Sequence, residues 1–107
     1  MVEWLAVVYD KPGADRTELR PLHLKDIPPA VESGIVTNAG AIYHGLDYEG
    51  KPSEFAGSAF NLVADTKEEA LEFLKKDVYA KSGIWDIDNI LIFPYGCAYR
   101  KGKDLPK

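Results

Sequence analysis

The stretch 58-SAFNLVADTKEEALEFLKKD-77 predicts a strand followed directly by a helix. Residues 58–64 are almost entirely apolar, as expected of a buried strand. Asp65 or Thr66 then caps a helix, because Thr66 and Glu69 have the spacing of a capping box. The apolar residues that follow recur at helical spacing, with glutamates and lysines between them. We therefore expect this helix to pack one face on a sheet.

Upstream of this stretch, the sequence predicts a first strand and a first helix. Residues 3–9 (EWLAVVY) are apolar and end in a strong turn signal. A helix begins near Arg20, with Pro21 suited to its first turn, because the positions of one helical face recur at steps of three and four: Leu19, Leu22, His23, Ile27 and Ala30. The pair Pro28 and Pro29 costs about 3 kcal/mol each inside a regular helix. We therefore expect a break or kink near Ile27.

A second strand and a loop come between the two helices. Residues 35–43 (IVTNAGAIY) predict a strand, and Gly40 inside it indicates a bulge or a close backbone approach. Residues 44–57 are rich in glycine and charge, so they predict a surface loop. Loops of this length often cover a binding site.

The end of the chain supplies the last strand. It is predicted over residues 90–93 and 95–99, with Pro94 indicating an edge position. The order of elements is therefore βαββαβ. This order predicts an α+β, ferredoxin-like fold, a four-stranded antiparallel sheet with two helices on one face.

Length and composition fit one small domain. The chain has 107 residues, of which 46% are hydrophobic and 28% are charged. We expect a single domain over residues 1–107, with a core at about 3–100 and a flexible tail at 101–107. A domain of this size buries only about two thirds of its unfolded surface, so association would add useful apolar burial. We therefore expect a homodimer formed through the open face of the sheet.

The charge distribution argues against nucleic acid as a partner. The formal net charge is -4, and the basic residues cluster only briefly, at Arg100, Lys101 and Lys103. We interpret that cluster as a solvated tail.

Cysteine usage and hydropathy favour the cytoplasm. Cys97 is the only cysteine, so no intrachain disulfide forms, and its apolar surroundings predict a packed thiol. Residues 1–9 lack a basic leader, and no apolar stretch approaches the roughly 20 residues that a membrane span needs.

Two polar side chains fall on faces that should be buried. His23 is in step with Leu19 and Ile27, so it belongs to the inner face of the first helix. If the second helix continues to Asp77, that carboxylate lies on its inner stripe as well. A carboxylate buried without a partner at a helix C-terminus is costly. His23 is the obvious partner for Asp77.

Less specific roles remain open for both residues. Asp77 is equally suited to cap a short helical turn at 78–82, and one carboxylate can cap a turn and accept a hydrogen bond from imidazole at the same time. His23 alone is also consistent with a histidine at the core edge that bonds a backbone carbonyl.

Several motifs resemble those of the YCII-related family. The resemblance covers about residues 4–100, and four stretches carry it: RPLHL at 20–24, Gly57-Ser58, DVYAKSGIW at 77–85 and IFPY at 92–95. It implies a dimeric α+β barrel, in which two ferredoxin-like sheets pack face to face. It also implies an active site at His23 and Asp77. The chain departs from the family pattern at Val78, where proline is usual, and at the Pro28-Pro29 pair.

A histidine oriented by a carboxylate transfers protons near neutral pH. We therefore expect a cofactor-free lyase or isomerase acting on a small cyclic or aromatic molecule, with His23 moving the proton and Asp77 orienting it. Residues expected to contact the substrate are Tyr9, Arg20, Gly40, Ser58, Tyr79, Trp85 and Tyr95. The alternatives are a noncatalytic small-ligand binding or accessory domain, and a purely structural histidine–aspartate pair.

No cofactor or metal is expected. His23 and His44 are the only histidines, and no cysteine or carboxylate cluster lies near either at ligand spacing. His44 is interpreted as a loop residue. The glycines do not form a nucleotide-binding loop of known spacing.

Overall fold

The strands pair in the order β2-β3-β1-β4, and every neighbouring pair is antiparallel. A computed structural model describes residues 1–103, and the tail flexibility expected for 104–107 lies outside these residues. The elements are β1 (Val2–Tyr9), α1 (Arg20–Glu32), β2 (Val36–Tyr43), β3 (Phe55–Ala64), α2 (Lys67–Lys75), α3 (Val78–Lys81), a 3-10 turn (Ile87–Asn89) and β4 (Leu91–Pro94). The predicted α+β fold is confirmed.

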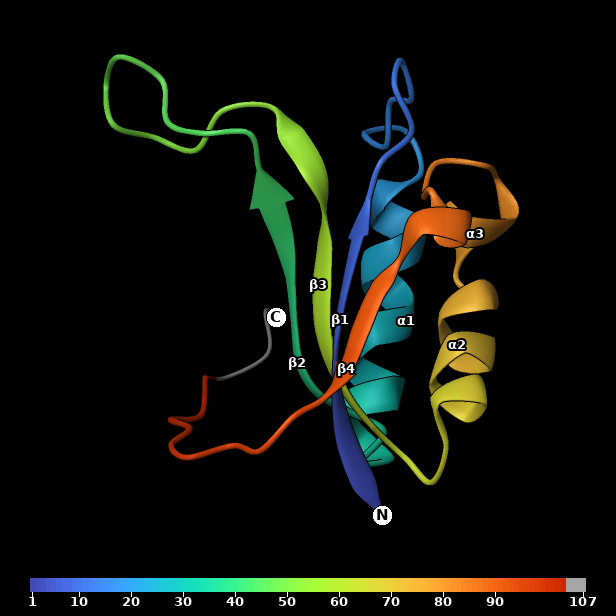
Figure 1. Cartoon of the computed structure of the whole chain (residues 1–107). Helices are drawn as coiled ribbons and strands as arrows, with labels where there is room; N and C mark the ends of the chain where they lie inside the picture. Colours follow the sequence, from blue (N-terminus) through green and yellow to red (C-terminus); the bar gives the residue numbers. More distant parts are fainter. Residues whose placement is uncertain (104–107) are drawn as a thin grey trace.

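All three helices lie on one side of the sheet (Figure 1). Side chains alternate along β1, so that Trp4, Ala6 and Val8 are buried beneath the helices. Phe60 and Leu62 of β3 extend the same layer, and they are almost fully buried. The opposite face of the sheet is left uncovered, flanked by the β2–β3 loop and by the segment after β4 (Figure 1).

Helix α1 runs unbroken through Pro28 and Pro29, so the break predicted near Ile27 is wrong. The two prolines remove the donors that would bond the carbonyls of Leu24 and Lys25. Both of those residues are exposed, so their carbonyls are accessible to solvent hydrogen bonds and the cost of the missing donors is reduced.

Two features hold α1 together beyond its prolines. Its inner face packs on the core through Ile27, Ala30 and Val31. Its end is a Schellman motif, in which Gly34 adopts φ 85° and donates to the Val31 carbonyl, while Ile35 donates to that of Ala30. Tertiary packing and a strong stop signal therefore outweigh the local cost of the prolines.

The irregularities of β2 are not at Gly40. The register shifts between Val36 and Asn38 and between Ile42 and Tyr43. Gly57 is the glycine that a close approach requires, since an added Cβ would lie 2.3 Å from the carbonyl oxygen of Val8.

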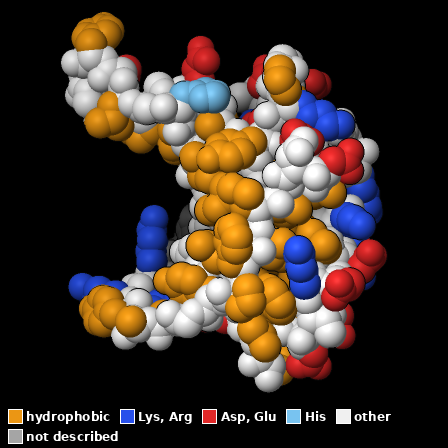
Figure 2. Space-filling model, viewed as in Figure 1, with side chains coloured by type: hydrophobic (Ala, Val, Ile, Leu, Met, Phe, Trp, Pro, Cys, Tyr) orange, Lys and Arg blue, Asp and Glu red, His pale blue; other side chains and the backbone are white. Residues whose placement is uncertain are grey.

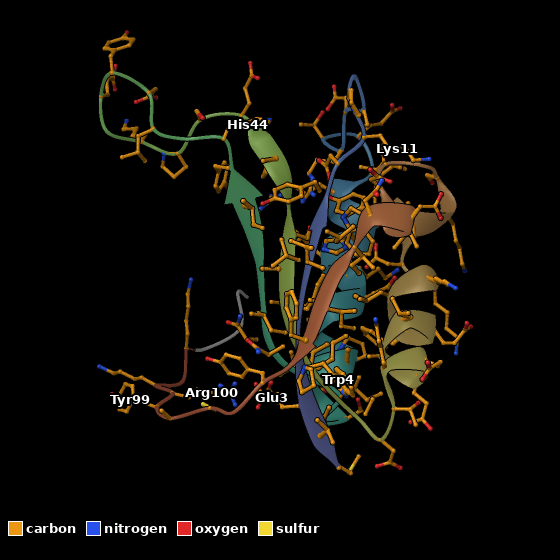
Figure 3. All side chains as sticks on the ribbon, viewed as in Figure 1. Glu3, Trp4, Lys11, His44, Tyr99 and Arg100 are labelled. Atoms are coloured by element: carbon orange, nitrogen blue, oxygen red, sulfur yellow. The ribbon has the colours of Figure 1, made fainter. Side chains whose placement is uncertain are left out.

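The β2–β3 loop is shorter than predicted, because β3 begins at Phe55 and leaves residues 44–54 as the loop. This loop projects away from the sheet (Figure 1). His44 lies at its start, as the interpretation of a loop residue requires, and at the far end of the molecule from Arg100 (Figure 3).

The predictions for α2 and for the last strand are confirmed only in part. Thr66 caps α2 and accepts from the backbone N–H of Glu69, as predicted. Strand β4 lies at the sheet edge, as Pro94 indicates, but ends there, so the strand predicted over 95–99 is absent. Cys97 is consequently exposed rather than packed. No helix among residues 1–103 has the length and apolar character to cross a membrane.

Candidate functional site

Asp77 lies between α2 and α3, two residues beyond the last residue of α2. The premise that α2 continues to Asp77 is therefore wrong, and the alternative of a cap for the next turn is what the structure has. Its Oδ1 accepts from the backbone N–H of Tyr79 at 2.9 Å and so caps α3. The cap fixes the carboxylate in a backbone-defined position.

The imidazole of His23 meets this carboxylate. Its Nδ1 lies 2.8 Å from Oδ2 and 2.9 Å from Oδ1 of Asp77. The two side chains are only 9% and 12% exposed. Because an ionised carboxylate only accepts hydrogen bonds, Nδ1 carries the hydrogen, and the lone pair of the neutral ring lies on Nε2. One carboxylate thus caps a helix and orients a histidine.

Aromatic rings hold the histidine in place. The ring of Tyr79 stacks on His23 with centroids 4.2 Å apart. Phe60 and Trp85 contact it edge-on, at 6.2 and 5.9 Å. The imidazole is therefore packed against three aromatic rings, and a change of its rotamer would disturb the core.

A cavity of about 490 Å³ lies beside this histidine, between α1 and β2. His23 lines it with four of the residues predicted to contact substrate, namely Arg20, Gly40, Ser58 and Tyr79. Its apolar wall consists of Leu24, Ile27, Val31, Ala39 and Ala41. A second hollow of about 560 Å³ on the other side of Arg16 lacks the histidine, so the chemistry favours the first.

Three predicted contact residues do not line this cavity. Trp85 is 1% exposed and supports His23 from within the core. Tyr9 and Tyr95 are 50% and 39% exposed. Tyr9 follows Val8, and strand alternation turns it to the face opposite the buried Val8. Tyr95 follows the end of β4 and bonds through its backbone N–H to Glu3.

Arg16 is a site residue that the sequence prediction missed. It is 3% exposed and lines the cavity. Its guanidinium binds both carboxylate oxygens of Asp10, at 2.6 and 2.9 Å, and lies 4.6 Å from the centre of the Tyr79 ring. Arg16 lies between the first predicted strand and the first predicted helix, where no local pattern indicates burial, so only the tertiary structure identifies it.

Residues 100–103 of the basic segment after β4 are exposed, as predicted for a solvated tail, but the prediction did not include their position beside the cavity. Arg100 forms an ion pair with Glu3, which lies beside it in Figure 3. Lys101 and Lys103 line the cavity with Arg16 and Arg20. The segment is thus part of the cavity wall.

Two hydroxyl groups at the cavity are buried without a hydrogen-bond partner among the described residues, Ser58 Oγ and Tyr79 Oη. Burial raises the pKa of Tyr79 above its ordinary value, although the nearby charges of Arg16 and Arg20 oppose this. The phenol therefore stays protonated and able to donate. Within residues 1–103, no group of three histidine, cysteine, aspartate or glutamate side chains is placed to hold a metal ion.

Relatives of the chain are named for the biosynthesis of fungal metabolites. Fusaric acid biosynthesis protein 2 of Gibberella fujikuroi is 30% identical over 95 residues, which are 87% of this chain and 91% of that protein. Aspercryptin biosynthesis cluster protein B of Emericella nidulans is 34% identical over 96 residues, but the match spans 62% of its length. No family model matches.

Two further matches bear on domain organisation and fold. The protein named aspartate kinase FUB3 of Fusarium oxysporum f. sp. lycopersici is 28% identical over 103 residues, 94% of this chain but 19% of that protein. A solved structure, the 5-chloro-2-hydroxyhydroquinone dehydrochlorinase TftG of Burkholderia phenoliruptrix AC1100 in complex with 2,5-dihydroxybenzoquinone, matches with a TM-score of 0.69. The match covers 88% of this chain and 93% of TftG, and at 19% identity it shows a shared fold.

Proposed function

Because this chain belongs to the family of fusaric acid biosynthesis protein 2, we propose that it is a small-molecule enzyme that transfers a proton without a cofactor. The substrate is a small cyclic or aromatic compound, and the reaction is of the lyase or isomerase type. One observation carries the proposal: Nδ1 of His23 is bound to Asp77, while the hydrogen bonds among the described residues leave Nε2 unused beside a cavity. Within this proposal the chain is of the YCII-related kind, with a catalytic pair of His23 and Asp77.

The proposed step starts from a neutral imidazole. Nε2 of His23 accepts a proton from a substrate carbon, and the electrons of that C–H bond form a new double bond. In a lyase the leaving group departs with its electron pair, and in an isomerase the proton returns from Nε2 to another substrate atom. Asp77 stabilises the imidazolium that forms between these events. The hydroxyls of Ser58 and Tyr79 donate to the substrate oxygen on which negative charge develops.

The proposed assembly is a homodimer through the uncovered sheet face, giving a dimeric α+β barrel. On this face Leu91 and Phe93 are 45% and 54% exposed. Apolar side chains continue along the sheet between the two projecting segments (Figure 2). The amide nitrogen of Asn61, also on this face, is buried without a partner among the described residues. A second copy would cover the apolar surface and offer that amide an acceptor.

A noncatalytic binding or accessory domain is the second candidate. It is favoured by the match to the protein named aspartate kinase FUB3, in which the related segment makes up 19% of a longer protein. There the same pair would anchor a polar group of a ligand without transferring a proton. A cytoplasmic location is proposed for either candidate, since Cys97 is a free, exposed thiol.

Hydrogen–deuterium exchange separates the two candidates. The protein is incubated in D₂O with small ring compounds that carry hydroxyl or oxo groups, including 2,5-dihydroxybenzoquinone, and proton NMR follows the loss of carbon-bound protons. The wild type is expected to accelerate exchange by about 100-fold or more over His23→Gln, the usual range for a general base. His44→Gln, the matched control at the exposed loop, keeps the wild-type rate. Binding of the compounds without exchange would support the accessory domain instead.

A further inference from the structure

The cavity beside His23 is lined by basic residues, although the chain as a whole is acidic. Five basic residues line it, and among residues 1–103 no aspartate or glutamate does: Arg16, Arg20, Arg100, Lys101 and Lys103. The formal net charge of the chain is -4. Such a local reversal of charge attracts anions into the cavity and repels cations.

Some of these charges are neutralised, and others are not. Arg16 is paired with Asp10, and Arg100 is paired with Glu3. Among residues 1–103, no carboxylate lies within ion-pair distance of Arg20, Lys101 or Lys103. The guanidinium of Arg20 lies 5.4 Å from the centre of the Phe55 ring, which restricts its position. Arg20 is therefore a positioned cation at the cavity that lacks an anion.

Uncharged groups complete the recognition pattern. The buried hydroxyls of Ser58 and Tyr79 lack partners and suit a ligand oxygen. Apolar side chains of α1 and β2, such as Leu24, Ile27 and Ala41, also line the cavity. This combination of apolar lining, buried hydroxyls and a guanidinium suits a ring compound with oxygen substituents.

We propose that the ligand of this cavity is a small ring compound bearing an anionic oxygen substituent, bound by Arg20 with help from Lys101 and Lys103. The ring lies on the apolar wall, and a second ring oxygen accepts from Tyr79 and Ser58. The inference rests on the proposed function in taking this cavity as the substrate site. Two sources of the anion share this chemistry, a carboxylate on the ring and an ionised ring hydroxyl.

Pairs of probes that differ in charge test the proposal. Benzoate is compared with benzamide for the carboxylate, and 2,5-dihydroxybenzoquinone with its dimethyl ether for the ionised hydroxyl. Amide NMR titration of the full chain measures each dissociation constant. At least one anion is expected to bind about tenfold or more tightly than its neutral counterpart, with shifts at residues 37–41 of β2. The tighter anion identifies the source.

Variants of Arg20 make the test specific. Arg20→Gln is expected to weaken binding of the preferred anion by about tenfold or more, the effect of losing a charge-assisted hydrogen bond. Arg20→Lys retains part of the affinity. Lys67→Gln, an equal loss of charge at an exposed position of α2, leaves it unchanged. Equal affinity for charged and neutral probes, no binding of either anion up to millimolar concentration, or equal loss in Arg20→Gln and Lys67→Gln would overturn the proposal.

This test does not depend on turnover. His23→Gln keeps the preference for an anion, because it removes the base and leaves Arg20 in place. If anions are preferred and no exchange occurs, the proton transfer fails while the ligand class stands. If exchange occurs only on neutral compounds, the ligand class fails while the proton transfer stands.

Discussion

Replacing Asp77 with alanine is expected to remove two interactions at once. The first is the cap of α3, where Oδ1 accepts from the N–H of Tyr79 at 2.9 Å. Loss of such a cap costs about 0.5–2 kcal/mol. The second is the bond to Nδ1 of His23, whose side chain is 9% exposed. A buried donor left without a partner costs about 1–3 kcal/mol. The free energy of unfolding should therefore fall by about 2–4 kcal/mol.

Asp77→Ser separates the two contributions. Serine caps helices almost as well as aspartate, but its short hydroxyl does not reproduce the two carboxylate oxygens that contact His23. Its stability should lie about 1 kcal/mol above that of Asp77→Ala. Urea denaturation followed by circular dichroism measures both variants against the wild type. A loss below about 0.5 kcal/mol in Asp77→Ala would refute the reasoning, because neither interaction would then be holding the structure.

Two further predictions concern a hydroxyl group and the sheet face. Tyr79→Phe should unfold with a free energy no lower than that of the wild type, because the hydroxyl makes no hydrogen bond among the described residues. Folding raises the pKa of Tyr79 above its unfolded value of 10.0. The protonated phenol therefore contributes its full stability below pH 10.0, and this contribution is lost as the pH rises above that value. Urea titrations at increasing pH should show this loss reduced in Tyr79→Phe, and an unchanged alkaline loss would contradict the assignment. Phe93→Lys, which places a charge on the uncovered sheet face, should give a folded monomer by analytical ultracentrifugation, whereas we expect the wild type to be a dimer. A dimeric Phe93→Lys protein would place the interface elsewhere.

Local sequence patterns determined the order and type of the main elements. Alternating or continuous apolar residues are enough to predict a strand. The cap at Thr66 and the apolar stripe are enough to predict α2. These signals act between residues a few positions apart, so they can be read along the chain. The βαββαβ order then leaves few arrangements in which each amphipathic element buries its apolar side. The fold class follows from these local facts.

Where local signals conflict with packing, the conformation of a segment depends on its tertiary contacts. The prolines of α1 predict a break, but the buried face of the helix and the stop at Gly34 keep it continuous. The strand predicted over 95–99 is missing, and those residues are exposed and lie outside the sheet. Propensity is a small energy per residue, and tertiary burial exceeds it.

The candidate site combines both kinds of information. Helical periodicity predicts that His23 lies on a buried face. For Asp77 the sequence leaves two interpretations open, a partner for His23 and a cap for the following turn. The contact between them joins residues 54 positions apart, and the sheet topology alone brings them together. No local signal predicted the burial of Arg16 or the position of Lys101 and Lys103 at the cavity. The same is true of the hydroxyls of Ser58 and Tyr79, which are buried without a partner among the described residues. Each depends on which distant segments close around the cavity, and the sequence pattern carries only the interactions between near neighbours along the chain.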